Sequence, residues 1–282
     1  LCCASLLAYA GKKVLVCEAH SKPGGVAHGF TKSGYCFESG PSLWSGLSSW
    51  PTTNPLGQIL HLLNEKVEII KYKSWKVLVP EGNFDLEVGD HPFRQKIQGM
   101  RGSKVLKEWD SFMDAIKPIS KIIEQTPLLT TSPDNLNIFE ILNIARKFIP
   151  NIQNASKISK GFGNIVDDHL KDPFLRNWVD LLSFLISGMP MHDTNTAAMS
   201  TLFGEWFNPN AYLEYPLGGS ETIVNALVKG LKKFKGDLLL SSRVEEIIFD
   251  NKLATGVKLT NGTLISSNNV VMNSDIWNSK DL

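Results

Sequence analysis

At 282 residues the chain is long enough to bury a substantial core, either as one large domain or as two that share an interface. Its 29 Lys and Arg residues against 28 Asp and Glu residues leave a formal charge of +1, which excludes the basic surface that a nucleic-acid partner requires. No apolar run reaches the roughly 18 to 20 residues of a spanning helix, so we expect any membrane contact to be peripheral.

The first elements are a helix and a buried strand. Residues 1–9 are apolar and lack a capping residue, which is typical of the inside of a helix, and Gly11 follows them. Residues 14–16 then predict a parallel strand, buried on both faces, that leads to Glu18. A carboxylate in this place accepts a hydrogen bond from a ribose hydroxyl in dinucleotide-binding βαβ units, although ordinary helix–strand junctions also carry one. In a complete unit a strand and a G-x-G-x-x-G turn precede this helix, so we expect them upstream of residue 1.

A glycine pair follows the strand. Gly24 and Gly25 would let the backbone pass close to a cofactor where any Cβ would obstruct it. A tight turn after Pro23 is the alternative for the pair taken alone. The combination with Glu18 and with the later Gly40 favours the cofactor interpretation.

These segments, KKVLVCEAHSKPGGVAHGF and TKSGYCFESGPSLWSGL, resemble the flavoprotein superfamily of amine oxidases, protoporphyrinogen oxidase and phytoene desaturases. Within it, the second segment is most similar to bacterial-type desaturases and prolycopene isomerases. The resemblance implies an α/β fold, with an incomplete Rossmann-like, glutathione reductase-like FAD-binding domain and an inserted α+β substrate domain. It also implies FAD as the cofactor, held by Glu18, Gly24, Gly25, Val26, Gly40 and Val244.

The C-terminal part supports the same resemblance. Gly218, Gly219 and Ser220 can begin an amphipathic helix with Ile223, Leu227 and Leu231 on one face. An antiparallel meander follows, with turns at residues 250–251 and 261–262, and then a buried strand near residues 270–273. In the family, the residue that matches Val244 presents its backbone to the adenine end of FAD, although a buried strand valine would look the same.

The resemblance divides the chain into an FAD-binding first part (1–60), a substrate or membrane-facing domain (61–212) and an FAD-binding second part (213–282). The middle domain combines strands within residues 67–88 with helices near 109–123, 138–148 and 172–186. The segment 136–152 is either an interfacial membrane helix or a helix that covers the core.

A wide apolar slot for a ligand is predicted around residues 188–190. Met189, Met191 and Met199 are adaptable side chains that could line it, although such residues are more often ordinary core. His192 and Asp193 are candidates for acid–base chemistry, but no catalytic residue is assigned. The six histidines form no i, i+4 ligand pair, so we predict no metal site.

The resemblance implies an FAD-dependent oxidoreductase that acts on an apolar polyene, as a carotenoid isomerase with reduced flavin or as a desaturase that passes hydride to flavin N5. An amine oxidase-type enzyme and a non-catalytic prenyl- or lipid-binding relative are the alternatives. A plastid or a cyanobacterial cytoplasm is the implied location, with peripheral membrane contact. Because the glycine-rich turn is expected upstream, we predict that residues 1–282 alone bind FAD poorly.

Overall fold

The structure is a computed structural model that divides into two compact units. The first unit comprises Leu1–Tyr72 and Leu213–Leu282, and the second comprises Lys73–Tyr212. The first unit includes Tyr72, because the strand that ends at Tyr72 pairs with the strand that begins at Leu213. The structure describes residues 1–40, 43–52, 54–125, 161–208 and 212–275, and the single positions 138, 146 and 277.

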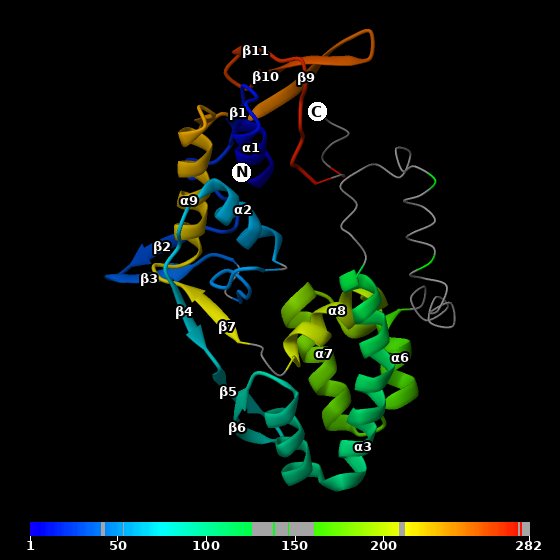
Figure 1. Cartoon of the computed structure of the whole chain (residues 1–282). Helices are drawn as coiled ribbons and strands as arrows, with labels where there is room; N and C mark the ends of the chain where they lie inside the picture. Colours follow the sequence, from blue (N-terminus) through cyan, green and yellow to red (C-terminus); the bar gives the residue numbers. More distant parts are fainter. Residues whose placement is uncertain are drawn as a thin grey trace. The chain divides into compact units, whose positions relative to one another are not determined.

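The first unit is built from two stretches of chain that meet in small sheets (Figure 1). Its first stretch contains α1 (Cys2–Tyr9), β1 (Leu15–Cys17), β2 (Gly29–Lys32), β3 (Tyr35–Glu38), α2 (Pro55–Leu63) and β4 (Ile69–Tyr72). Its second stretch contains β7 (Leu213–Pro216), α9 (Ser220–Lys233), β8 (Asp237–Leu239), β9 (Val244–Asp250), β10 (Leu253–Leu259) and β11 (Leu264–Ser266). Strand β1 pairs with β8 in parallel. The other pairs are antiparallel: β2 with β3, β4 with β7, and β10 with both β9 and β11.

The predicted first helix and strand are confirmed as α1 and β1, but the predicted burial of the strand is wrong. Leu15 is 39% exposed. Within the described residues β1 has a single neighbour, β8, so one edge of the strand and part of its faces are left uncovered.

Helix α9 forms the core of the first unit, as its sequence pattern predicts. Ile223, Leu227 and Leu231 are 3%, 5% and 0% exposed, and they lie on the face that packs inward. Leu60 and Leu63 of α2 form one buried cluster with Ile223, Ala226 and Leu227. Burying one such leucine contributes about 1.5–3 kcal/mol, so this small cluster is the main apolar support of the unit.

The predicted C-terminal meander is confirmed as β9, β10 and β11. Its turns place Asn251 at φ 48° and Gly262 at φ 84°, the left-handed conformations that such tight turns require. The strand predicted near residues 270–273 is wrong: these residues have no strand pairing, and Val271 is 64% exposed.

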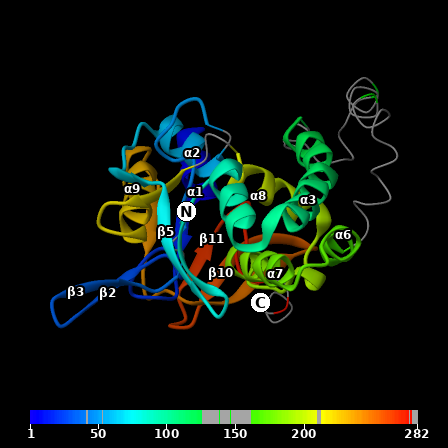
Figure 2. The same ribbon diagram turned by 90° about the horizontal axis from the view of Figure 1, so that it is seen from below.

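The second unit packs helices against one hairpin. It contains β5 (Ser74–Val79), β6 (Gly82–Glu87), α3 (Asp90–Gln125), α6 (Phe162–His169), α7 (Pro173–Ser187), the 3-10 turn η3 (Met191–Asp193) and α8 (Thr196–Trp206). Helix α3 breaks at Gly102, whose φ of 81° and ψ of 177° are not helical. Figure 2 shows α3, α6, α7 and α8 gathered in this unit. The predicted segment 136–152 lies outside the described residues, apart from two single positions.

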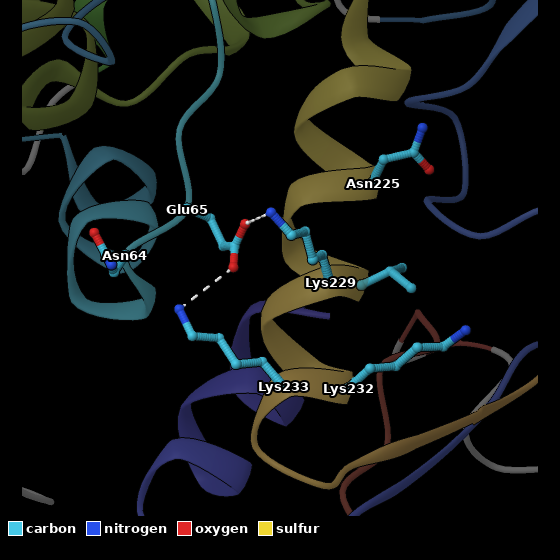
Figure 3. A pocket seen from close by; sticks show the side chains of 7 residues that line it. Asn64, Glu65, Asn225, Lys229, Lys232 and Lys233 are labelled. Atoms are coloured by element: carbon cyan, nitrogen blue, oxygen red, sulfur yellow. Dashed lines mark ion pairs between the residues drawn. The ribbon is translucent and has the colours of Figure 1, made fainter.

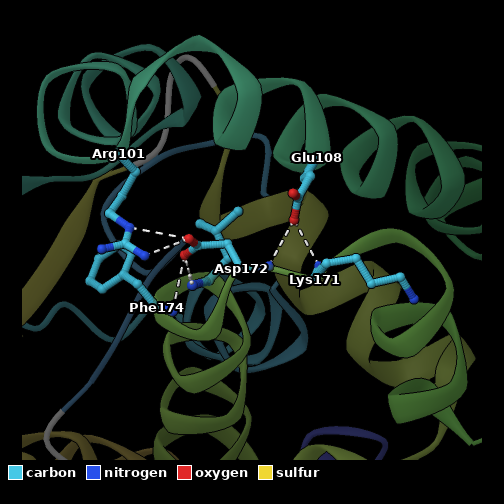
Figure 4. A network of polar contacts seen from close by, with 6 residues as sticks. Arg101, Glu108, Lys171, Asp172 and Phe174 are labelled. Carbon is cyan, nitrogen blue, oxygen red and sulfur yellow. Dashed lines mark hydrogen bonds and ion pairs between the residues drawn. The ribbon is translucent and has the colours of Figure 1, made fainter.

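Helix α7 begins at a carboxylate network that explains its predicted start (Figure 4). Asp172 Oδ1 accepts hydrogen bonds from the amides of Phe174 (3.0 Å) and Leu175 (3.2 Å), which caps the first turn. Its Oδ2 accepts from Arg101 Nη2 at 2.6 Å. Glu108 Oε2 accepts from the Asp172 amide at 2.8 Å. The network therefore joins the start of α7 to α3.

Aromatic side chains fill the core of the second unit. Trp109, Phe112, Phe162 and Phe203 are each 0% exposed. The Phe93 ring stacks on Trp178 with centroids 5.3 Å apart.

None of the described helices is both long and apolar enough to cross a membrane.

Candidate functional site

The predicted carboxylate lies at the carboxyl edge of the parallel strand pair. The strands end with Cys17 opposite Leu239. Directly after them, the Glu18 amide donates to the Leu239 carbonyl oxygen and the Ser242 amide donates to the Glu18 carbonyl oxygen, each at 2.8 Å. Val244 begins β9 two residues further on, where it is half-buried. The structure thus brings the segments of Glu18 and Val244 together at one edge, where ligands of open parallel sheets bind.

One oxygen of the Glu18 carboxylate remains free for a ligand. Oε1 accepts a hydrogen bond from the His20 amide at 2.8 Å. Oε2 has no hydrogen-bond partner within the part of the chain that the structure describes. The half-buried carboxylate is therefore oriented by its own turn and can accept from a hydroxyl group.

The two glycines of the pair have different structural roles. Gly24, at φ 106°, packs on α9, and a Cβ there would lie 2.6 Å from Val224 Cγ2. Gly25, at φ 61°, has no atom within 4 Å of the corresponding position. Packing alone therefore requires glycine at Gly24, whereas Gly25 leaves open space beside the backbone.

Val26 and Gly40 meet through their backbones. A Cβ on Gly40 would overlap the carbonyl oxygen of Val26, so only glycine fits there. Val26 is 70% exposed, and its Cβ lies 3.2 Å from the same position. The loop after the glycine pair and the loop after β3 are therefore held together at these two residues.

Two histidines that the sequence interpretation did not assign connect these features. The His20 ring stacks on the His28 ring with centroids 5.4 Å apart. His28 Nδ1 lies 2.7 Å from the Gly25 carbonyl oxygen. The six predicted residues therefore belong to segments that contact one another in turn. The only sequence signal for the histidines is their position on either side of the glycine pair.

Glu38 is a second unassigned residue, and it holds the start of α9. Its Oε1 accepts from the Ser220 amide at 2.8 Å and lies 3.4 Å from the Tyr215 hydroxyl. Its Oε2 is buried and has no hydrogen-bond partner among the residues that the structure describes. Burial, with a smaller effect of the nearby Glu38 carboxylate, raises the pKa of Tyr215. These contacts join residues almost two hundred positions apart, so no local pattern could have indicated them.

In the second unit, the predicted apolar lining is only partly available. Met191 and Met199 are 6% and 1% exposed in the core, so they cannot line an open slot. Met189 is 45% exposed and follows the end of α7. Three more large apolar side chains are exposed at this end of the helix: Leu181, Phe184 and Leu185.

His192 and Asp193, the candidates for acid–base chemistry, lie in η3. His192 Nε2 lies 3.9 Å from Asp167 Oδ1. Asp167 is itself paired with Arg176 at 2.6 Å. Across the described ranges, no group of three or more His, Cys, Asp or Glu side chains could hold a metal ion.

Comparison with known proteins identifies the family. The model of the family described as "Flavin containing amine oxidoreductase" matches residues 1–282. A prolycopene isomerase from Daucus carota, described as chloroplastic, is 25% identical in an alignment of 284 positions that covers 99% of this chain and 45% of the relative. A lycopene-forming phytoene desaturase from Pantoea ananas is 25% identical in an alignment of 273 positions that covers 95% of this chain and 52% of the relative. The chain thus spans about half the length of these curated relatives.

Solved structures show the fold. The PF1083 protein from Pyrococcus furiosus is similar with a TM-score of 0.66 at 15% identity, over 100% of this chain and 58% of that one. A putrescine oxidase is similar with a TM-score of 0.61 at 15% identity, over 94% of this chain and 54% of that one. The α/β fold class predicted from the sequence is therefore confirmed.

Proposed function

Because the chain belongs to the flavin-containing amine oxidoreductase family, we propose that the protein is an FAD-dependent enzyme that acts on a carotenoid or a similar polyene. The family description specifies a flavin, and the finer choice of FAD rests on the residues of the first unit. The free Oε2 of Glu18, at the carboxyl edge of β1 and β8, is the observation that carries this choice.

The residues present fit the ribose end of a dinucleotide. A carboxylate oriented by the His20 amide can accept from a ribose hydroxyl, and the open space at Gly25 admits a ligand beside the backbone. Gly40 lies in the loop after β3, which contacts the glycine-pair loop, and Val244 lies at the start of β9. A bound flavin would supply hydride or electron transfer. In this proposal the chain binds and orients the cofactor.

The polyene assignment rests on the relatives and on the end of α7. The matched relatives are described as prolycopene isomerases and phytoene desaturases. Leu181, Phe184, Leu185 and Met189 expose a run of large apolar groups, which suits a long apolar ligand. We favour the isomerase branch, with desaturation as the second reaction to assay. The chloroplastic relatives support a plastid location, and an apolar substrate supports peripheral contact with a membrane.

The test of the cofactor uses the natural protein. After reconstitution with FAD, we expect flavin absorption bands in the region of about 350–500 nm that bleach with dithionite. Glu18→Gln should weaken FAD binding about tenfold or more, because a charge-assisted hydrogen bond contributes about 1.5–3 kcal/mol. Glu246→Gln changes the charge equally at an exposed position of β9 and should leave FAD binding unchanged.

The outcomes separate the proposals. Absence of flavin after reconstitution would favour a non-catalytic binding protein and reject the enzyme. Equal FAD affinity in Glu18→Gln and in the natural protein would reject the proposed role of Glu18 but not the proposed enzyme. If flavin binds, turnover of a cis-carotene with reduced flavin and of a saturated precursor with oxidised flavin distinguishes isomerase from desaturase.

A further inference from the structure

A shallow hollow of about 720 Å³ lies along α9, and Figure 3 shows the residues that line it. It forms where α9 meets the turn that ends α2. Its polar lining comes from Asn64, Glu65, Asn225, Lys229, Lys232 and Lys233.

A buried carboxylate fixes two of the lysines. The Glu65 side chain is only 4% exposed, and its oxygens lie 3.0 Å from Lys229 Nζ and 3.6 Å from Lys233 Nζ. Lys233 Nζ also donates to the Leu63 carbonyl oxygen at 2.9 Å. Lys233 thus has two contacts that orient its ammonium group, whereas Lys229, whose side chain is 76% exposed, has one.

The other polar residues of the hollow are Lys232, Asn64 and Asn225. Lys232 forms no ion pair, and the side chains of Asn64 and Asn225 make no hydrogen bond, within the described part of the chain. Figure 3 shows Lys229 and Lys233 directed to Glu65 on one side of α9, with Lys232 and Asn225 on the other. The donors therefore extend across the helix and not around a single point.

The charges of the lining favour an anion. Three ammonium groups and one carboxylate leave the lining with two excess positive charges. The C-terminal end of α9 offsets only about half a charge of this excess. Lysines in a last turn would complement the helix dipole on their own, but the dipole does not account for a buried glutamate that holds two of them.

We propose that this hollow binds a phosphate group, carried either by a soluble organic phosphate or by the headgroup of an anionic lipid. The hollow is larger than one phosphate, and the spread of donors across α9 suits a ligand that extends beyond it. The proposal is independent of FAD, because none of the lining residues belongs to the edge of β1 and β8.

The experiment compares three variants of the protein. Lys232→Gln removes one ammonium group from the hollow, and the double variant Lys229→Gln/Lys232→Gln removes two. Lys252→Gln removes an exposed lysine from the turn between β9 and β10 and serves as the control. Each protein is titrated with inorganic pyrophosphate by calorimetry, and is sedimented with phosphatidylcholine vesicles with and without phosphatidylglycerol.

We expect affinity to fall about threefold in Lys232→Gln and about tenfold in the double variant, with no change in Lys252→Gln. Binding should also weaken as salt rises. If the Lys232 variants lose pyrophosphate binding, the ligand is a soluble phosphate. If they lose only their binding to vesicles that contain phosphatidylglycerol, the ligand is a lipid headgroup. Either result supports the proposal. Absence of both kinds of binding, or binding that persists in the double variant, would overturn it.

Discussion

Substitution of Gly219 by alanine tests how α9 is anchored. Gly219 has φ 84° and ψ −177°, a conformation that is essentially restricted to glycine. A Cβ there would also overlap Glu38 Oε1, which accepts from the Ser220 amide. The backbone strain costs about 1–3 kcal/mol and loss of the charge-assisted hydrogen bond about 1.5–3 kcal/mol. We therefore expect Gly219→Ala to destabilise the first unit by about 2.5–6 kcal/mol.

Gly102 provides a matched control in the second unit. Its φ of 81° and ψ of 177° are nearly the same, but no atom lies within 4 Å of its Cβ position. Gly102→Ala should therefore cost only the strain, about 1–3 kcal/mol. Hydrogen–deuterium exchange along a urea series measures the two units separately. Equal costs in the two variants, or no reduction of the Gly219→Ala effect in a Glu38→Ala background, would refute the reasoning.

Three other predictions concern the first unit. Glu38→Gln keeps an oxygen for the Ser220 amide but buries an amide group in place of Oε2. We therefore expect urea unfolding to show a free energy of unfolding lower by about 1 kcal/mol. A larger decrease than in Glu38→Ala would contradict this account. Leu63→Ala should cost about 2–5 kcal/mol, because Leu63 is 0% exposed, whereas the same change at Leu62, 44% exposed, should cost little in thermal unfolding. Burial raises the pKa of Tyr72 above its ordinary 10.0, so the native state keeps the phenol proton at a pH where the unfolded state loses it. The free energy of unfolding should therefore fall as the pH rises above 10.0. In Tyr72→Phe, the midpoint of urea unfolding should fall less over the same pH range.

The sequence was most informative where the pattern is local. The apolar period of Ile223, Leu227 and Leu231 defined the buried face of α9, because residues three and four apart share one side of a helix. The turn residues at Asn251 and Gly262 likewise located the meander. These elements depend on neighbours within a few residues, so one segment of sequence contains the whole signal.

The contacts that organise the candidate site depend on distant residues. Glu38 meets Ser220 across 182 positions, and the fully buried Glu214 accepts hydrogen bonds from the Leu47 and Ser48 amides at 2.6 and 2.9 Å. Such pairs have no spacing that a single sequence can indicate. The expected burial of β1 was wrong for the same reason, because burial depends on which other strands lie beside it, and Leu15 is half-exposed.

The second unit should fold without the first. Tyr72 and Leu213 are direct partners in the β4–β7 pair, so the chain leaves and re-enters the first unit at neighbouring points. Every buried residue of the aromatic core lies between Val77 and Phe207. An isolated chain of residues 73–212 therefore retains its entire core, and we expect it to unfold cooperatively in urea with near-ultraviolet circular dichroism from its packed tryptophans. Non-cooperative unfolding, or absence of that signal, would mean that the unit needs contacts from the rest of the protein.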